Sequence, residues 1–255
     1  MQGLDQKRVF LITGGAGGIG RATATALGQA GSRVIITDVD HVAGEAAATE
    51  ISKQTGAEVR FINLDVTDEV QVNEVAEQLE KEGWPVYGVM ANAGIAPTSS
   101  AVDYPASLWR QTVDINLNGV FWTAQAFGRR MLERGEGVVL ITASIAAFGV
   151  VSPETHAAYG ATKAAVAHLA ELLGVEWAKQ GVRVNAVAPG YTATPILDKL
   201  KEEAPDVYDQ WLARIPMGRL NTPEEIANSA AFLFSDLASG ITATVLHVDG
   251  GYSAR

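Results

Sequence analysis

Short apolar runs alternate along the chain with longer segments whose apolar residues recur every three or four positions. The runs are typical of buried strands, and the longer segments are typical of amphipathic helices. Alternating strands and helices form a parallel sheet with helices on both faces, joined by right-handed crossovers. The pattern predicts a single α/β domain over residues 1–255, with a seven-stranded parallel sheet whose strands lie at 9–12, 33–37, 58–62, 86–90, 137–141, 182–187 and 244–248.

The helices of this pattern have recognisable ends. Asp68 can cap a helix through residue 82, and Thr222-Pro223-Glu224-Glu225 is a capping box with proline at the first helical position. The capping box begins a helix to about residue 234. Further helices are predicted at 41–54, 106–134 and 157–180.

A glycine-rich turn, Thr13 to Gly20, connects the first strand to the first helix. Glycine lets the backbone come close to a ligand, and the free N–H groups and dipole of a helix N-terminus favour an anion such as a pyrophosphate. The second strand ends in Asp38, 18 residues after Gly20, where a dinucleotide fold places the carboxylate that binds the adenosine ribose. The turn therefore predicts a dinucleotide site.

Composition narrows the class of protein. The chain has 255 residues, of which 47% are hydrophobic, and its formal net charge of −10 argues against nucleic acid as a partner. It contains no cysteine, which excludes disulfides and thiolate zinc sites. No apolar run approaches the length of about 20 residues that spans a bilayer, and the N-terminus does not resemble a signal peptide. We expect no membrane partner and a cytoplasmic location.

Tyr159 and Lys163 are four residues apart, so they lie on one face of a predicted helix. A cation beside a phenol favours the phenolate and lowers a pKa that starts near ~10. Ser144 lies at the end of the fifth predicted strand, so its hydroxyl and that of Tyr159 could converge on one substrate oxygen. We expect acid–base chemistry at this place.

In order along the chain, these motifs resemble those of the short-chain dehydrogenase/reductase family. They are Thr13-Gly14-x-x-x-Gly18-Ile19-Gly20, Asn92-Ala93-Gly94, Asn116, Ser144, Tyr159-x-x-x-Lys163, and Pro189-Gly190 with Thr192 and Thr194. The resemblance covers essentially the whole length and implies a doubly wound Rossmann fold and hydride transfer with a nicotinamide dinucleotide. It also implies a homotetramer.

The resemblance further implies a role for each matching residue. Tyr159 would be the general acid–base, Lys163 would bind the nicotinamide ribose and lower the tyrosine pKa, and Ser144 would polarise the carbonyl or alcohol. Asn116 would hold a water that relays protons through Lys163. The other cofactor-binding residues would be Gly14, Gly17, Gly18, Ile19, Gly20, Asp38, Asp65, Val66, Asn92, Ala93, Gly94, Pro189, Gly190, Thr192 and Thr194.

Charge at the end of the second strand indicates which cofactor is used. Asp38 would repel a 2′-phosphate but can accept hydrogen bonds from a free ribose diol. Relatives that use NADP commonly carry a basic residue in the glycine turn or just after this strand, whereas this chain has Ala16, Gly17 and Val39. The sequence therefore predicts NAD(H).

The substrate is less constrained than the mechanism. The interval from Ser144 to Tyr159 is two residues longer than the commonest family spacing, and the residues from about 191 to 220 would form a substrate lid. Within the lid, Tyr208-Asp209-Gln210-Trp211-Leu212 and Pro216-Met217-Gly218-Arg219 resemble segments of polyol and sugar-alcohol dehydrogenases of this family, which favours a polyol or sugar alcohol as substrate. Vicinal-diol and cyclic secondary alcohols and a 3-oxoacyl thioester remain alternatives. The candidate substrate residues are Ser144, Ala146, Val151, His156, Tyr159, Tyr191 and Trp211.

Two other functional classes are weighed. A dinucleotide-binding protein without activity is disfavoured because serine, tyrosine and lysine are all present. A zinc-dependent dehydrogenase is disfavoured because the chain lacks cysteine and clustered His/Glu ligands, so we expect no metal.

Overall fold

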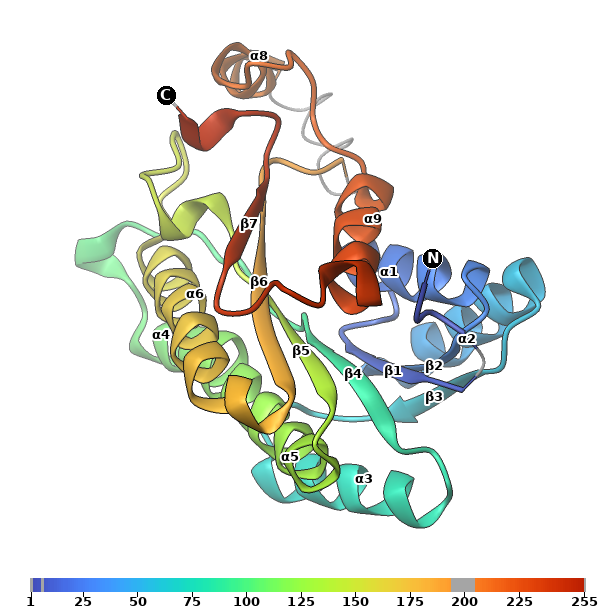
Figure 1. Ribbon diagram of the computed structural model, residues 1–255. Helices are drawn as coiled ribbons and strands as arrows, with labels where there is room; N and C mark the ends of the chain where they lie inside the picture. The colour runs from blue at the N-terminus through green and yellow to red at the C-terminus, as the bar shows by residue number, and fades with distance from the viewer. Residues whose placement is uncertain (1, 6, 194–204, 255) are drawn as a thin grey trace.

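One seven-stranded parallel sheet forms the centre of the computed structural model, which describes residues 2–5, 7–193 and 205–254 (Figure 1). The strand order is β3-β2-β1-β4-β5-β6-β7. The order reverses between β1 and β4, and ligands of such sheets bind at the carboxyl ends of the strands beside this reversal. The strands are β1 (Val9–Thr13), β2 (Arg33–Asp38), β3 (Val59–Asn63), β4 (Val86–Ala91), β5 (Gly137–Thr142), β6 (Val182–Pro189) and β7 (Val245–Val248).

Helices cover both faces of the sheet, as Figure 1 shows. One face carries α1 (Gly18–Gln29), α2 (His41–Thr55) and α9 (Pro223–Phe234), and the other carries α3 (Glu69–Lys81), α5 (Gly119–Arg134) and α6 (Ala157–Trp177). The short helix α4 (Ala106–Val113) precedes α5, and α8 (Pro205–Arg214) lies beyond the carboxyl ends of β6 and β7 (Figure 1). Within the described ranges, no helix combines the length and apolar character that crossing a bilayer would require.

The apolar runs of the strands are continuous because both faces of the sheet are buried. In β1, Val9 and Leu11 belong to the core beneath α3, α5 and α6, whereas Phe10 and Ile12 belong to the core beneath α1, α2 and α9. Side chains of a strand point alternately to opposite faces, so a single strand supplies both cores.

The predicted seven-stranded parallel α/β fold is confirmed, with strand ends that differ by at most two residues. The helical stretch 106–134 is confirmed at both ends, but a wide π-helical turn, Asp114–Asn118, separates α4 from α5. Similarly, the last three residues of the helix predicted at 157–180 form a 3-10 turn, Ala178–Gln180, after α6. Periodicity alone does not distinguish these helix types.

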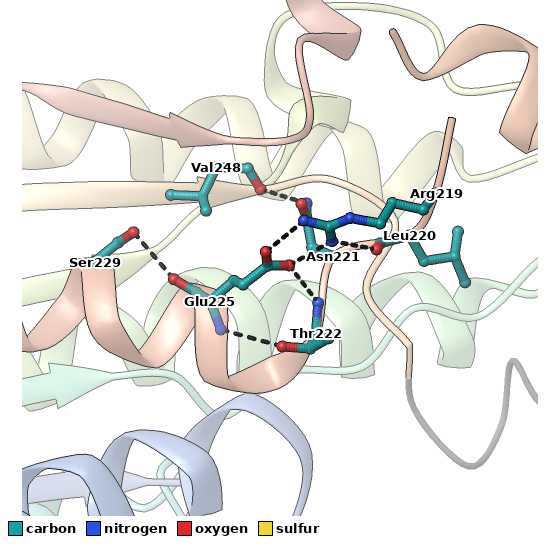
Figure 2. A network of polar contacts seen from close by, with 7 residues as sticks. All are labelled: Arg219, Leu220, Asn221, Thr222, Glu225, Ser229 and Val248. Carbon is teal, nitrogen blue, oxygen red and sulfur yellow. Dashed lines mark hydrogen bonds and ion pairs between the residues drawn. The ribbon is translucent and has the colours of Figure 1, made fainter. Parts of the chain in front are cut away.

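Both predicted helix caps are present. The Asp68 side chain accepts a hydrogen bond from the backbone N–H of Gln71, and Thr222 and Glu225 form the reciprocal capping box of α9. Glu225 also pairs with both terminal nitrogens of Arg219, at 2.8 and 2.7 Å (Figure 2). The hydrogen bonds from Arg219 and from the Thr222 backbone lower the pKa of Glu225 to about 2.

The region predicted as a substrate lid, 191–220, is described in part, because residues 194–204 lie outside the described residues. Backbone hydrogen bonds of Asn221 connect the beginning and the end of this region. The Asn221 N–H donates to Tyr191 O at 2.9 Å, and Asn221 O accepts from Ala193 N at 2.7 Å. The Asn221 side chain donates to Val248 O of β7 at 2.8 Å (Figure 2). The segment that follows β6 is thereby fixed to the start of α9.

Candidate active site

The glycine turn between β1 and α1 passes so close to itself that side chains are excluded at its end. A Cβ atom on Gly20 would lie 2.3 Å from the carbonyl oxygen of Gly14. At Gly17, in contrast, an added Cβ would meet nothing within 4 Å. Gly17 is the N-cap of α1, and no side chain caps this helix end. The first N–H groups of α1 therefore face open space, which suits a bound anion.

A cleft of about 980 Å³ lies over the carboxyl ends of β1 to β4. Eight of the residues predicted to bind a cofactor line it: Gly14, Gly17, Asp38, Asp65, Val66, Asn92, Ala93 and Gly94. Gly18, Ile19 and Gly20 form the first turn of α1, and Pro189, Gly190 and Thr192 lie at the end of β6 or just after it. Thr194 lies outside the described residues.

Asp38 is held at the end of β2 by two backbone groups. Its Oδ2 atom accepts a hydrogen bond from Ala16 N in the glycine turn at 3.2 Å, and its Oδ1 atom accepts one from Asp40 N at 3.2 Å. A carboxylate has about four acceptor positions, so capacity remains for hydroxyl groups in the cleft. The open space above Gly17, the uncapped N-terminus of α1 and this carboxylate fit a dinucleotide.

The far wall of the cleft was missed by the sequence analysis. It is formed by α4 and the π-helical turn, through Ser107, Arg110, Gln111, Asp114 and Ile115. The polar residues at 107, 110, 111 and 114 follow helical spacing and mark one helix face. A polar face is normally turned to solvent, so the spacing alone did not reveal a cleft.

Asn116 lies in the π-helical turn and is completely buried. Its Oδ1 atom accepts from Ile95 N at 2.9 Å, and its Nδ2 atom donates to Ile95 O at 2.8 Å. A Cβ on Gly94 would lie 3.2 Å from Asn116 Oδ1 and 3.6 Å from Lys163 Nζ. The amide of Asn116 and the ammonium of Lys163 thus converge beside Gly94, where the turn after β4 passes.

Lys163 is buried on α6, and its Nζ atom donates to Thr142 O at the end of β5, at 2.6 Å. The same nitrogen lies 5.7 Å from the centre of the Tyr159 ring. Burial lowers the pKa of Lys163 to about 8. The lysine is therefore close to losing its proton in the neutral to mildly alkaline range.

The expectation of a lowered Tyr159 pKa is wrong, because desolvation outweighs the effect that lowers it. Burial raises the Tyr159 pKa above its ordinary value, and hydrogen bonding with the Ser144 side chain opposes this increase. Desolvation disfavours the charged form of each group, so it acts against phenolate and ammonium alike. The side chains of Ser144 and Tyr159 do face each other, as the sequence predicted.

The other candidate substrate residues form two groups of contacts. Ala146 N donates to Ser144 Oγ at 3.2 Å, and the ring centres of His156 and Tyr159 are 5.5 Å apart. Tyr191 stacks on Trp211 of α8 with ring centres 4.5 Å apart, and Trp211 is 3% exposed.

Val151 is half-buried in the loop that connects Ser144 to Tyr159. In the part of the chain that the structure describes, no three His, Asp or Glu side chains are grouped as metal ligands.

Comparison with known proteins finds the same architecture over the full length. A family model described as enoyl-(acyl carrier protein) reductase matches residues 14–253. Galactitol 2-dehydrogenase (L-tagatose-forming) of Cereibacter sphaeroides is 39% identical over 98% of this chain and 99% of its own length. Cis-4-hydroxycyclohexanecarboxylate dehydrogenase of Sinomonas cyclohexanicum is also 39% identical, over 97% of both chains.

Among solved structures, one described as gox2181 superposes with a TM-score of 0.94 at 38% identity, covering 100% of this chain and 97% of that one. Other similar proteins differ in the cofactor that their descriptions name. One is an NAD-dependent glycerol dehydrogenase, another structure is of an NAD⁺-bound xylitol dehydrogenase, and two structures hold NADP.

Proposed function

Because this chain belongs to the short-chain dehydrogenase/reductase family, a family of oxidoreductases that includes its CH–OH dehydrogenase relatives, we propose that it transfers a hydride between NAD(H) and a polyol or sugar alcohol. The observation that carries the proposal is the meeting of Ser144, Tyr159, Lys163 and Asn116 beside a cleft that ends at Asp38.

The chain's own residues handle the proton. The nicotinamide ring, when bound, accepts or gives the hydride. Ser144 donates a hydrogen bond to the reacting oxygen of the substrate. Tyr159 accepts the proton of the substrate hydroxyl in oxidation and donates a proton to the carbonyl oxygen in reduction. Lys163 would bind the nicotinamide ribose of the cofactor. Asn116 holds a water through which the proton passes between Lys163 and solvent.

Asp38 supports NAD(H) over NADP(H). Its carboxylate can accept two hydrogen bonds from a ribose diol, whereas a 2′-phosphate would bring two negative charges beside it. Likeness to known proteins does not decide the cofactor, because similar proteins are described with each of the two.

The names of similar proteins support a polyol as substrate. Galactitol, glycerol and threitol dehydrogenases are among them. A 3-oxoacyl thioester is the second candidate, because the matching family model is described as an enoyl-(acyl carrier protein) reductase, an activity that also acts on acyl thioesters. Biosynthetic reductions usually use NADPH, so the argument from Asp38 weighs against it.

The proposal is tested by absorbance of the reduced nicotinamide. Purified protein is supplied with NAD or NADP and with polyols, cyclic diols, simple secondary alcohols or a 3-oxoacyl thioester, alongside Tyr159→Phe. Turnover of a polyol with NAD, reduced by about 10²- to 10⁴-fold in the variant, is the expected result. NADPH-dependent thioester reduction without alcohol turnover would refute both cofactor and substrate.

We also propose a homotetramer, on the strength of the family resemblance. A cytoplasmic location stays a prediction from the sequence.

A further inference from the structure

Glu154 lies on the loop that connects the two hydroxyl-bearing residues of the candidate active site. Its carboxylate accepts a hydrogen bond from the Tyr191 hydroxyl, which lies 3.2 Å from Oε2 and 3.4 Å from Oε1. Two residues further along, the His156 ring lies beside the Tyr159 ring. Tyr191 itself directly follows Gly190, at the end of β6. Glu154 therefore contacts a residue that follows the end of β6, and it lies two residues before the histidine ring that adjoins Tyr159.

Glu154 sits on a stretch of loop that is fixed on both sides. Arg214 of α8 donates through Nη1 to Ser152 O at 3.1 Å, and Ser99 N donates to Thr155 O at 3.1 Å. The backbone before and after Glu154 is thus anchored to different parts of the chain. A carboxylate held in this way loses little conformational freedom when a ligand binds.

The carboxylate has unused capacity to accept hydrogen bonds. A carboxylate offers about four acceptor positions, and Tyr191 donates one hydrogen. Within the described ranges Glu154 forms no ion pair, although it is half-buried. Burial and the charge of Glu154 raise the pKa of Tyr191, so its hydroxyl stays protonated and remains a donor.

Aromatic surface lies next to this acceptor. Tyr191 stacks on Trp211, and Tyr252 meets Tyr191 edge to face with ring centres 5.8 Å apart. The indole N–H of Trp211 is buried and has no hydrogen-bond acceptor among the described residues. The packed rings hold the Tyr191 hydroxyl in place beside the carboxylate. A carboxylate that accepts from hydroxyls suits a neutral polyhydroxylated ligand.

We propose that Glu154 is a specificity-determining residue whose carboxylate, held by the Tyr191 hydroxyl, accepts a hydrogen bond from a second hydroxyl group of a neutral polyol substrate. This inference rests on the proposed function and adds the feature that separates polyols from other secondary alcohols. An alcohol without the second hydroxyl leaves the carboxylate unpaired, and an anionic substrate is repelled by it.

The test compares three alcohols of similar size: butane-2,3-diol, butan-2-ol and the anion 3-hydroxybutyrate. Wild type, Glu154→Gln and Tyr191→Phe are assayed with NAD, and thermal unfolding checks that each variant is folded. Glu77→Gln removes an exposed carboxylate from α3 and serves as the matched control. The dissociation constant for NADH is measured by fluorescence titration in each protein.

We expect Glu154→Gln to lower kcat/KM for the diol by roughly ten- to a hundredfold, mainly through KM, because a hydrogen bond to a charged acceptor is lost. Turnover of butan-2-ol and the affinity for NADH should stay within about threefold, and 3-hydroxybutyrate should become a better substrate. Tyr191→Phe should also lower kcat/KM for the diol. Glu77→Gln should change none of these values.

Equal losses for the diol and butan-2-ol in Glu154→Gln would overturn the role of Glu154 while leaving the proposed function intact. If kcat/KM for 3-hydroxybutyrate does not rise in Glu154→Gln, the carboxylate of Glu154 does not repel anionic substrates. If wild type oxidises neither these three alcohols nor any polyol of the wider panel with NAD, the proposed function fails and this inference falls with it. If Glu154→Gln does not fold, Tyr191→Phe decides between the same outcomes.

Discussion

At the scale of single residues, burial governs the chemistry of the candidate site. Lys163 is 3% exposed, and its charged form loses hydration that one hydrogen bond to Thr142 O only partly replaces. Desolvation of the neighbouring Tyr159 moves the tyrosine pKa in the direction that keeps the proton. The sequence placed these two side chains together correctly but gave the wrong sign for the tyrosine pKa, because local spacing does not report desolvation.

Lys163 should make the stability of the fold depend on alkaline pH. Its folded pKa is about 8 against 10.5 for the exposed group, so the unfolded chain binds more protons between these values. Stability therefore rises as pH increases from 8 to 10.5, and below pH 8 the lysine costs on the order of 3 kcal/mol. Urea unfolding of Lys163→Met and wild type should show a variant that is more stable at pH 7.

The advantage of Lys163→Met should shrink towards pH 10. A stability difference that does not change with pH would show that the buried ammonium carries no such cost. The variant should have lost catalysis, which separates its stability from its function.

Asp38 should set the preference between the two nicotinamide dinucleotides. Replacing it by Ala removes the charge that would repel a 2′-phosphate and the acceptor for the ribose diol. We expect the ratio of kcat/KM for NAD over NADP to fall by roughly ten- to a hundredfold. Initial rates with both cofactors measure it.

Asp40→Asn is the control for Asp38→Ala. Asp40 caps α2 through Ala43 N, and asparagine caps equally well, so this variant removes a neighbouring charge without disturbing the helix. Comparable efficiency of wild type with NADP and NAD would be incompatible with the argument from Asp38.

At the scale of secondary-structure elements, two helix ends shape the cleft. The start of α1 has no side-chain cap, and there is open space beside its N-cap Gly17. The π-helical turn Asp114–Asn118 provides the buried position of Asn116, while α4 supplies the opposite wall. The first feature was predicted from the glycines. The second was not, because a π-helical turn has no distinctive residue pattern.

Gly17 and Gly20 should respond differently to alanine. Gly17 has an extended backbone, with φ −150° and ψ 177°, and free space around it, so Gly17→Ala should fold normally but weaken NADH binding. Gly20→Ala would force a Cβ against the Gly14 carbonyl oxygen and should lower stability by a few kcal/mol, about 1–3. Thermal unfolding and NADH titration of both variants separate the two effects.

Unaltered NADH affinity in Gly17→Ala would argue that the space above Gly17 is not used by the cofactor. A Gly20→Ala variant as stable as wild type would show that the turn can relax.

At the scale of the whole molecule, the order of the strands decides which residues meet. Because the order reverses between β1 and β4, the ends of β2 and β3 lie on one side of the cleft and those of β4 and β5 on the other. The ribose-binding side and the proton-transferring side of the candidate site are thereby brought to one edge of the sheet.

The proposed homotetramer is a further property of the whole molecule. Exposed apolar side chains on α6, Leu172 and Val175, are consistent with an interface on this helix. Sedimentation equilibrium should give a mass of four chains of 26.9 kDa each. A single-chain mass across the micromolar range would rule the tetramer out.

The sequence by itself determined the strands, the capped helices, the glycine turn and the motif residues, because hydrophobic periodicity, glycine geometry and helix caps are local properties of the chain. Tertiary structure alone decided the wall that α4 contributes to the cleft, the raised pKa of Tyr159 and the contact between Glu154 and Tyr191. These features depend on desolvation and on contacts between segments far apart in the chain. The spacing of neighbouring residues predicts neither of them.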